Sequence, residues 1–341
     1  MADAAEPASS GSPAERARAL ADAARVGDRR ALARLLTAVE NRTGVGEHAL
    51  RKLYPLAGGA HLVGITGPPG AGKSTLVASL IAAYRAADRT VAVVAVDPSS
   101  PITGGALLGD RVRMQSYATD DGVFIRSMAS RGHAGGLAST STAAAAVLDA
   151  AGFQVVLLET VGTGQSEVEV AATADTTVVL QAPEMGDEVQ AIKAGLLEVA
   201  DLVVVNKGDR PGAQRTAAQL RAMLVPGVAR ADRDPDRPTP KRPEVLVTTA
   251  TSGEGIPALL VALDRHRAGL VDREGGRGAA RRARAEGQVR AVLAQRVWDR
   301  LHRPDRAIGT ATVIGAVAAH DIDPYAAADH LLAGLTEEDH A

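Results

Sequence analysis

The sequence contains no cysteine and few aromatic residues. The absence of cysteine from all 341 positions excludes disulfides, thiolate metal sites, iron–sulfur clusters and cysteine nucleophiles. Aromatic residues make up only 2% of the chain, whereas 46% of its residues are hydrophobic. The core must therefore consist of Val, Leu, Ile and Ala, which suits parallel strands buried on both faces. The same shortage argues against single-stranded nucleic acid as a partner, because bases stack on aromatic side chains.

The sequence also lacks a strong charge bias and a long hydrophobic run. It has 38 Lys and Arg residues against 40 Asp and Glu residues, which gives a formal net charge of −2. This composition provides no domain-wide positive field for a nucleic-acid backbone. No stretch approaches the roughly 18 apolar residues of a membrane-spanning helix, and the first residues lack the apolar segment of a signal peptide. We therefore expect a cytoplasmic protein without a membrane or nucleic-acid partner.

Most of the chain repeats one pattern, in which a short aliphatic strand is followed by a Gly-containing loop and a helix. Strands are predicted at residues 61–66, 90–96, 123–126, 154–159, 176–181, 201–206 and 244–249. Helices are predicted at residues 73–86, 136–151, 188–199, 213–224 and 256–267. This alternation predicts an α/β fold with a doubly wound, mostly parallel sheet.

The two ends of the chain differ from this middle part. Residues 1–13 are rich in Ala, Ser and Pro and are predicted to be a disordered tail. Residues 14–56 form a predicted N-terminal helical extension, with two helices separated near Gly27. The α/β domain is predicted to cover residues 57–270, and a C-terminal helical arm and tail to cover residues 279–341.

A phosphate-binding motif stands between the first predicted strand and its helix. The segment from Gly67 to Ser74 matches G-x-x-x-x-G-K-[ST] in the strand–loop–helix setting that this motif requires. Backbone N–H groups of such a loop surround a β-phosphate, Lys73 reaches the β- and γ-oxygens, and Ser74 can bind Mg²⁺. The sequence therefore predicts a nucleoside triphosphate site in a P-loop NTPase. Its predicted residues are Gly67, Pro68, Pro69, Gly70, Ala71, Gly72, Lys73, Ser74 and Thr75.

A second motif indicates which base is bound. Asn206, Lys207 and Asp209 match N-K-x-D at the end of a predicted strand, and Thr249 and Ala250 follow another strand. The Asp209 carboxylate can accept hydrogen bonds from both the N1–H and the 2-amino group of guanine. Adenine has no donor at either position, so a site built for guanine rejects it. The sequence therefore predicts GTP rather than ATP.

Acidic residues at two strand ends are candidate Mg²⁺ ligands. Asp97 and Glu159 each follow an aliphatic strand, and Mg²⁺ prefers oxygen ligands such as these carboxylates and the Ser74 hydroxyl. The N–H of Gly162 could contact the γ-phosphate. We therefore predict Lys73, Glu159 and Gly162 as catalytic residues.

The predicted switch at residues 160–168 lacks one common catalytic residue. In small signalling GTPases a glutamine that orients water directly follows the switch glycine. Thr163 occupies that position here, and Gln165 lies two residues later. We therefore expect slow intrinsic hydrolysis that a partner accelerates.

With these motifs in place, the chain resembles the MeaB/ArgK family, GTPase chaperones of adenosylcobalamin-dependent acyl-CoA mutases. The resemblance covers about residues 27–267 and is carried by VDPSSPITGGALLGDRVRM (96–114), FIRSMASRGHAGGL (124–137), ETVGTGQSEVEV (159–170), GDEVQAIKAGLLEVAD (186–201) and NKGD (206–209). It implies that Asp97, Asp110 and Glu159 surround Mg²⁺, with Asp110 in the first switch. It also implies that Asn206, Lys207 and Asp209 read the base.

The resemblance further implies a route from the nucleotide to a partner. A third switch would match residues 181–193, with Asp187, Glu188, Gln190 and Lys193 at its charged positions. The C-terminal arm forms a homodimer in the family, so residues 279–301 are a candidate dimer helix. The alternative for this segment is a solvated, Arg-rich helix face.

Three functions remain open at this point. The first is a Mg²⁺-dependent GTPase that gates cofactor loading onto, and protects or reactivates, methylmalonyl-CoA mutase or a close relative. The second is a kinase or ATPase that energises basic amino-acid transport, an older label for the family. The third is a metallochaperone GTPase for nickel or zinc, which the absence of Cys and the scatter of the eight His residues disfavour.

Overall fold

A seven-stranded parallel sheet lies at the centre of the computed structural model. The structure describes residues 11–98, 117, 119–130, 136–160, 173–183, 197, 199–224, 242–272 and 276–336. Its strands are β1 (His61–Thr66), β2 (Val91–Pro98), β3 (Val123–Ser130), β4 (Val155–Thr160), β5 (Thr176–Gln181), β6 (Leu202–Val205) and β7 (Glu244–Val247). They are ordered β3-β2-β4-β1-β5-β6-β7, with every neighbouring pair parallel. The predicted doubly wound fold is thereby confirmed.

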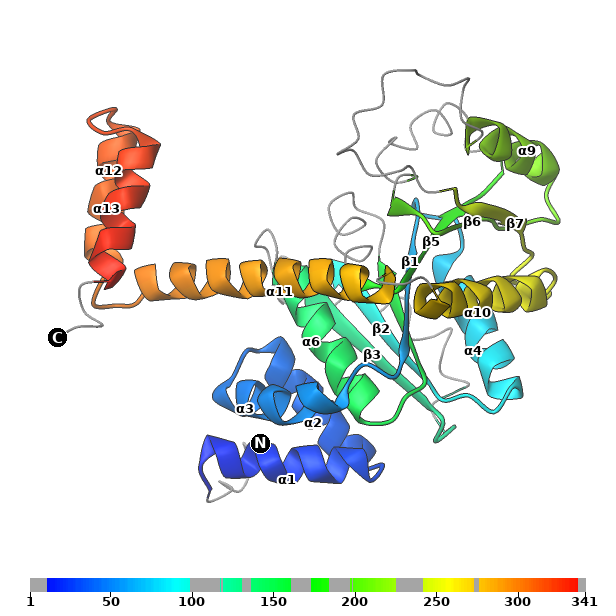
Figure 1. The fold of residues 1–341 in the computed structure, drawn as a ribbon, viewed down its shortest axis with the longest axis horizontal. Coiled ribbons are helices and arrows are strands. Elements are labelled where there is room, and N and C mark those ends of the chain that lie inside the picture. Colours follow the sequence, from blue (N-terminus) through cyan, green and yellow to red (C-terminus); the bar gives the residue numbers. More distant parts are fainter. Residues whose placement is uncertain are drawn as a thin grey trace, which may run out of the picture. The chain divides into compact units, whose positions relative to one another are not determined.

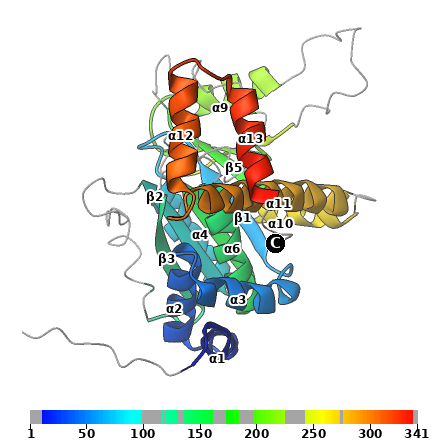
Figure 2. The same cartoon turned by 90° about the vertical axis from the view of Figure 1, so that its left-hand side faces the viewer.

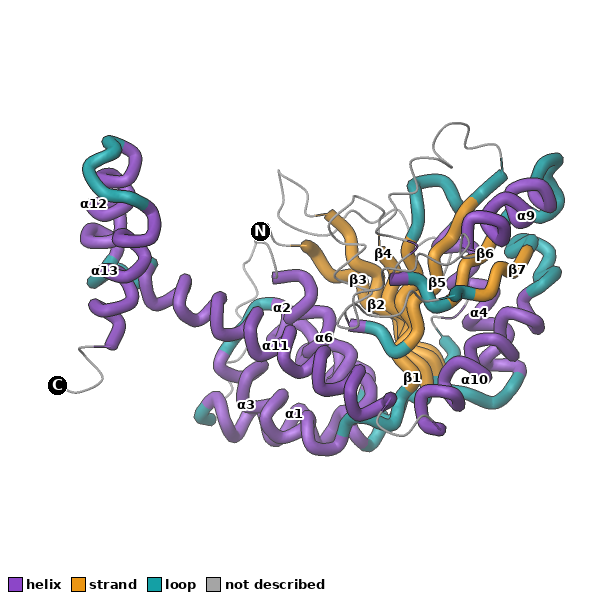
Figure 3. The backbone as a smooth tube through the Cα atoms, turned by 45° about the horizontal axis from the view of Figure 1, so that its top comes forward, coloured by secondary structure: helices purple, strands orange, loops and turns teal. Residues whose placement is uncertain are grey.

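Helices cover both faces of the sheet (Figure 3). The described helices of the α/β part are α4 (Lys73–Ala86), α6 (Gly136–Ala150), α9 (Ala213–Leu224) and α10 (Ile256–Asp272), and the helix predicted at residues 188–199 lies mostly outside the described residues. Successive strand residues point to opposite faces, so Val178 and Leu180 share a core with α4 and α10, whereas Val179 packs in the core of α9. Most buried strand residues are aliphatic, as the composition indicated, although polar residues such as His61, Glu159 and Gln181 are buried among them.

Three N-terminal helices pack together, and the second and third of them pack against α6 (Figures 1 and 2). They are α1 (Pro13–Arg25), α2 (Arg29–Glu40) and α3 (Gly44–Leu53), followed by the short helix η1 (Tyr54–Leu56). Ser12, Asp28 and Thr43 cap the three α-helices through their side-chain oxygens. The first two helices agree with the prediction, whereas α3 was not predicted.

Beyond the α/β part come α11 (Gly276–Leu301), α12 (Ala307–Ala318) and α13 (Pro324–Thr336). The prediction missed α12, whose many β-branched residues have low helix propensity. The chain divides into two compact units, residues 1–284 and residues 285–341. Among the described helices, none combines the length and the apolar character needed to span a membrane.

Candidate functional site

The loop that joins β1 to α4 approaches the strand end that carries the N-K-x-D motif. Gly72 ends this loop in the left-handed region, at a φ of 92°. A Cβ at this position would collide with the Asn206 side-chain nitrogen. Glycine is therefore required at position 72 both by the backbone conformation and by this close approach.

The Lys73 side chain lies against the same loop. Its ammonium donates hydrogen bonds to the carbonyl oxygens of Gly67 at 2.8 Å and Pro68 at 3.1 Å. Lys73 is 7% exposed at the first position of α4, where the helix dipole favours a bound anion. The Lys73 ammonium and the N-terminus of α4 thus lie together beyond the C-terminal end of β1.

Glu159 lies beside this helix start. Strands β1 and β4 are adjacent, with Ile65 opposite Glu159. The Ser74 hydroxyl donates to Glu159 Oε1 at 2.7 Å, and Glu159 is buried. The structure therefore brings together two of the four predicted Mg²⁺ ligands. It places the backbone of Asp97 near the end of the neighbouring strand β2, and the Asp97 side chain is outside the described part.

Asn206 connects the phosphate loop to the segment that follows β7. Its side-chain nitrogen donates to the Ala71 carbonyl at 3.0 Å. Its side-chain oxygen accepts from the Ala250 N–H at 3.1 Å and from the Thr248 hydroxyl at 3.2 Å. These three bonds fix the orientation of the buried amide. Asn206 therefore holds the ends of three chain segments in one arrangement.

The rest of the motif turns sharply beside the same segment. Lys207 adopts a φ of 59°, and the Gly208 N–H donates to the Thr248 carbonyl at 2.9 Å. The Asp209 side chain is exposed and accepts no hydrogen bond from the described residues. Thr249 is 5% exposed, and its N–H donates to the Glu254 carbonyl at 2.9 Å. The carboxylate predicted to read guanine is therefore sterically accessible next to a fixed backbone.

Seven predicted site residues cannot be placed in this arrangement. They are Asp110, Gly162, Gln165, Asp187, Glu188, Gln190 and Lys193, all of which lie outside the described residues. Their roles stay predictions. Within the described part, no group of three or more His, Asp or Glu residues could hold a metal ion.

The sequence interpretation missed one residue that contacts the site. The Ser79 hydroxyl on α4 lies 2.6 Å from the carbonyl oxygen of Ala250. The only signal in the sequence was a polar residue among the aliphatic positions Leu76, Val77, Leu80 and Ile81, all four of which are buried. Such a pattern alone does not indicate which distant segment the hydroxyl contacts.

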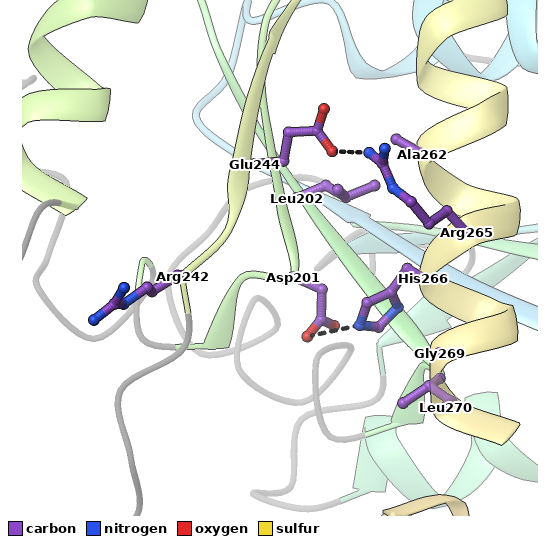
Figure 4. A pocket seen from close by; sticks show the side chains of 9 residues that line it. All are labelled: Asp201, Leu202, Arg242, Glu244, Ala262, Arg265, His266, Gly269 and Leu270. Atoms are coloured by element: carbon purple, nitrogen blue, oxygen red, sulfur yellow. Dashed lines mark hydrogen bonds and ion pairs between the residues drawn. The ribbon is translucent and has the colours of Figure 1, made fainter. Parts of the chain in front are cut away.

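A second polar cluster lies at the opposite edge of the sheet, beside a cavity of about 310 Å³ (Figure 4). The His266 ring on α10 lies 3.5 Å from Asp201 and 2.8 Å from the Thr176 hydroxyl. The same hydroxyl lies 2.8 Å from Nε2 of His61. Burial of His61 lowers its pKa to about 4. Because His61 and Thr176 begin β1 and β5, and Asp201 directly precedes β6, this cluster is separate from the phosphate loop, which follows the other end of β1.

Comparison with known proteins identifies the family. A family model described as methylmalonyl Co-A mutase-associated GTPase MeaB matches residues 32–305, well over half of the chain. The chain belongs to the MeaB family. It is a P-loop GTPase, in agreement with the resemblance noted from the sequence.

Individual relatives support this membership. A protein of Pyrococcus abyssi named as a GTPase is 47% identical over 306 residues, which cover 90% of this MeaB-family chain and 93% of that protein. The mouse mitochondrial methylmalonic aciduria type A homolog is 41% identical over 194 residues, covering 57% of this chain and 46% of the mouse protein. A crystal structure described as an LAO/AO transport system kinase aligns with a TM-score of 0.65 at 27% identity, covering 94% of this chain and 98% of that one.

Proposed function

We propose that this chain is a Mg²⁺-dependent GTPase that gates cofactor loading onto an adenosylcobalamin-dependent acyl-CoA mutase and protects or reactivates that enzyme. The observation that carries the nucleotide part is the Asn206 amide, which joins the phosphate loop to the Thr248–Ala250 segment. This connection fixes the distance between a phosphate-binding end and a base-reading end. One purine nucleoside triphosphate can therefore contact both ends, and the Asp209 carboxylate selects guanine over adenine.

The roles within the nucleotide site follow from their chemistry. The N–H groups of residues 67–75 and the Lys73 ammonium bind the β- and γ-phosphates. Asp209 accepts hydrogen bonds from N1–H and the 2-amino group of guanine, while Lys207, Thr249 and Ala250 surround the base. The N–H of Gly162 donates to the γ-phosphate.

The oxygen atoms near the phosphate end fit Mg²⁺. The Ser74 hydroxyl and the Glu159 carboxylate, 2.7 Å apart, are the hard oxygen donors that this ion prefers. We propose that they hold the ion with Asp97 and Asp110. When bound, the ion supplies positive charge against the β- and γ-phosphate oxygens. Ser74 and Glu159 then set its position relative to Lys73.

The mutase partner is supported by two names and by the switch segments. The family description specifies a methylmalonyl-CoA mutase-associated GTPase, and the mouse relative is named for methylmalonic aciduria. Our candidates for coupling nucleotide state to that partner are two polar residues, Gln165 and Gln190, and three charged ones, Asp187, Glu188 and Lys193. A switch of this kind must have two states that the γ-phosphate biases.

We also propose a homodimer formed by the C-terminal unit, residues 285–341. Of its described hydrophobic residues, only Ala327 and Leu335 are buried. Its exposed large hydrophobic residues are Val289, Val292, Leu293, Trp298, Ile308, Ile314, Tyr325 and Leu332. A unit this small buries only a limited core and is marginally stable alone. A second copy of the same unit would cover these side chains.

Measured GTP turnover with and without methylmalonyl-CoA mutase tests the proposal. We expect intrinsic turnover well below the range of roughly 1–100 s⁻¹ seen in kinases. Adding the mutase should raise turnover at least about tenfold, because the partner is expected to complete a site that lacks the water-orienting glutamine. Lys193→Glu should abolish the rise and leave GTP affinity unchanged. Fast turnover by the isolated protein, or no response to any acyl-CoA mutase, would contradict the proposed coupling.

Asp209→Asn provides a control for the nucleotide itself. The change removes a charged acceptor of two hydrogen bonds, so GTP should bind at least about 100-fold more weakly. The matched variant Asp121→Asn changes another exposed aspartate and should bind GTP normally. Equal turnover of ATP and GTP by the unmodified protein would instead favour the transport kinase or ATPase.

A further inference from the structure

Ser79 contacts the segment predicted to read the base, although it lies on the helix that begins at the phosphate loop. Its hydroxyl is 2.6 Å from the Ala250 carbonyl and 3.0 Å from the Thr75 carbonyl within α4. A serine hydroxyl has one proton, so the shorter contact takes the larger share of this donor. The bond joins residues 171 positions apart in the sequence.

This bond completes the support of Ala250. The N–H of Ala250 is held by Asn206 at 3.1 Å, and its carbonyl is held by Ser79 at 2.6 Å. Both peptide groups that flank Ala250 are therefore fixed. Ala250 is 5% exposed and packs in the same hydrophobic cluster as Leu76 and Leu80 of α4.

One helix thereby determines two positions. The N-terminus of α4 presents Lys73 and Ser74 at the phosphate end, and Ser79, in the second turn, holds the segment at the base end. A helix rises about 1.5 Å per residue and is stiff, so it sets a constant distance between these ends. Removing the Ser79 hydroxyl would leave the phosphate end unchanged and free one side of Ala250.

We propose that Ser79 is a positioning residue for guanine recognition, acting through the Ala250 carbonyl. This inference rests on the proposed GTP site. It assigns the discrimination between guanine and adenine partly to a residue that contacts neither the base nor the phosphates. Because Ala250 lies at the base-reading end, loss of the Ser79 hydroxyl should weaken only nucleotides whose guanine binds there.

The experiment compares the affinities of GTP, ATP and inorganic triphosphate for the full-length protein by isothermal titration calorimetry. In Ser79→Ala, GTP affinity should fall about three- to tenfold, the usual effect of losing one hydrogen bond. Affinities for ATP and inorganic triphosphate should stay within about twofold of the unmodified protein, because neither depends on Ala250. Ser79→Thr retains the hydroxyl and should restore GTP affinity.

Thr37→Ala is the matched control. Thr37 also donates to a carbonyl four residues earlier in its helix, that of Ala33 at 3.0 Å, but it accepts from Arg126 and does not contact Ala250. Wild-type GTP affinity in Ser79→Ala, or an equal loss for all three compounds, would overturn the positioning role. A lack of preference for GTP over ATP in the unmodified protein would instead refute the proposed function.

Discussion

His61 illustrates how a single buried residue determines a hydrogen-bond chain. Thr176 has one hydroxyl proton, yet it lies 2.8 Å from a ring nitrogen of His61 and 2.8 Å from one of His266. With the other nitrogen of His266 facing Asp201, His266 accepts from Thr176 and His61 donates to it. The remaining His61 nitrogen, Nδ1, then carries no proton. Its lone pair has no hydrogen-bond partner among the described residues.

This arrangement predicts a stability that depends on pH. Protonating His61 would bury a second N–H and a charge, and burial accordingly lowers its pKa to about 4 from an ordinary 6.5. The unfolded chain binds this proton at a higher pH than the folded one, so stability is greatest above pH 6.5 and falls as the pH approaches 4. The loss over this window should be about 3 kcal/mol. Urea unfolding at several pH values measures it.

The neighbouring charges oppose one another and do not reverse this direction. Asp175 and Asp264 favour the protonated form of His61, whereas Arg267 and Arg89 disfavour it. His61→Gln removes the titrating group and should flatten the decline between pH 6.5 and 4. His48→Gln, at an exposed position on α3, should leave the decline unchanged. A decline of the same steepness in His61→Gln would show that other groups cause it.

At the scale of elements, helix α3 depends on one close contact. Gly46 lies where α3 passes the end of α2, and a Cβ there would collide with the Ala38 carbonyl and lie 2.8 Å from the Val39 nitrogen. Replacing glycine by alanine within a helix usually stabilises it by about 0.5–1 kcal/mol. We expect Gly46→Ala to reduce the free energy of unfolding by about 1–3 kcal/mol instead, because two backbones must separate.

Gly44→Ala is the internal comparison for this test. Gly44 is two residues away in the same helix, and the nearest atom to a Cβ there is 3.8 Å away. This variant should be between unchanged and about 1 kcal/mol more stable. Chemical denaturation of both variants gives the difference. Equal stability of the two would mean that α2 and α3 move apart at little cost.

The same helix shows which elements the sequence could predict. The boundaries of α4 and α9 agree with the prediction because their apolar spacing and adjacent Gly residues are local signals. Helix α3 was missed because it opens with Gly44 and Gly46, whose low propensity is overcome only by packing on α2. The β/α alternation likewise predicted the sheet, whereas the strand order required the structure.

The candidate site divides in the same way. The phosphate loop and the N-K-x-D motif are runs of adjacent residues, so the sequence reveals them directly. The three bonds of Asn206 and the bond of Ser79 join segments 42 to 171 residues apart. A sequence pattern does not specify such partners, because they depend on which strand ends become neighbours in the sheet.

At the scale of the whole molecule, the proposed homodimer requires that the exposed apolar residues of the C-terminal unit lie in the interface. Ile308 on α12 is 80% exposed and Leu332 on α13 is 49% exposed. Placing a charge at an apolar interface leaves that charge desolvated and unpaired. We therefore expect Ile308→Asp with Leu332→Asp to convert a dimer into a monomer. Sedimentation velocity over a range of protein concentrations measures the change.

The single tryptophan offers a second measurement of the same association. Trp298 on α11 is 47% exposed and stacks on His302 at a ring-centroid distance of 4.2 Å. If a second copy covers it, its emission should shift to shorter wavelength as the protein concentration rises. Val26→Asp changes a residue that is 86% exposed at the end of α1, outside the C-terminal unit, and should retain the shift. A monomer at every concentration, with constant emission, would contradict the dimer and leave the proposed GTP site unaffected, since all residues proposed to contact the nucleotide belong to the other unit.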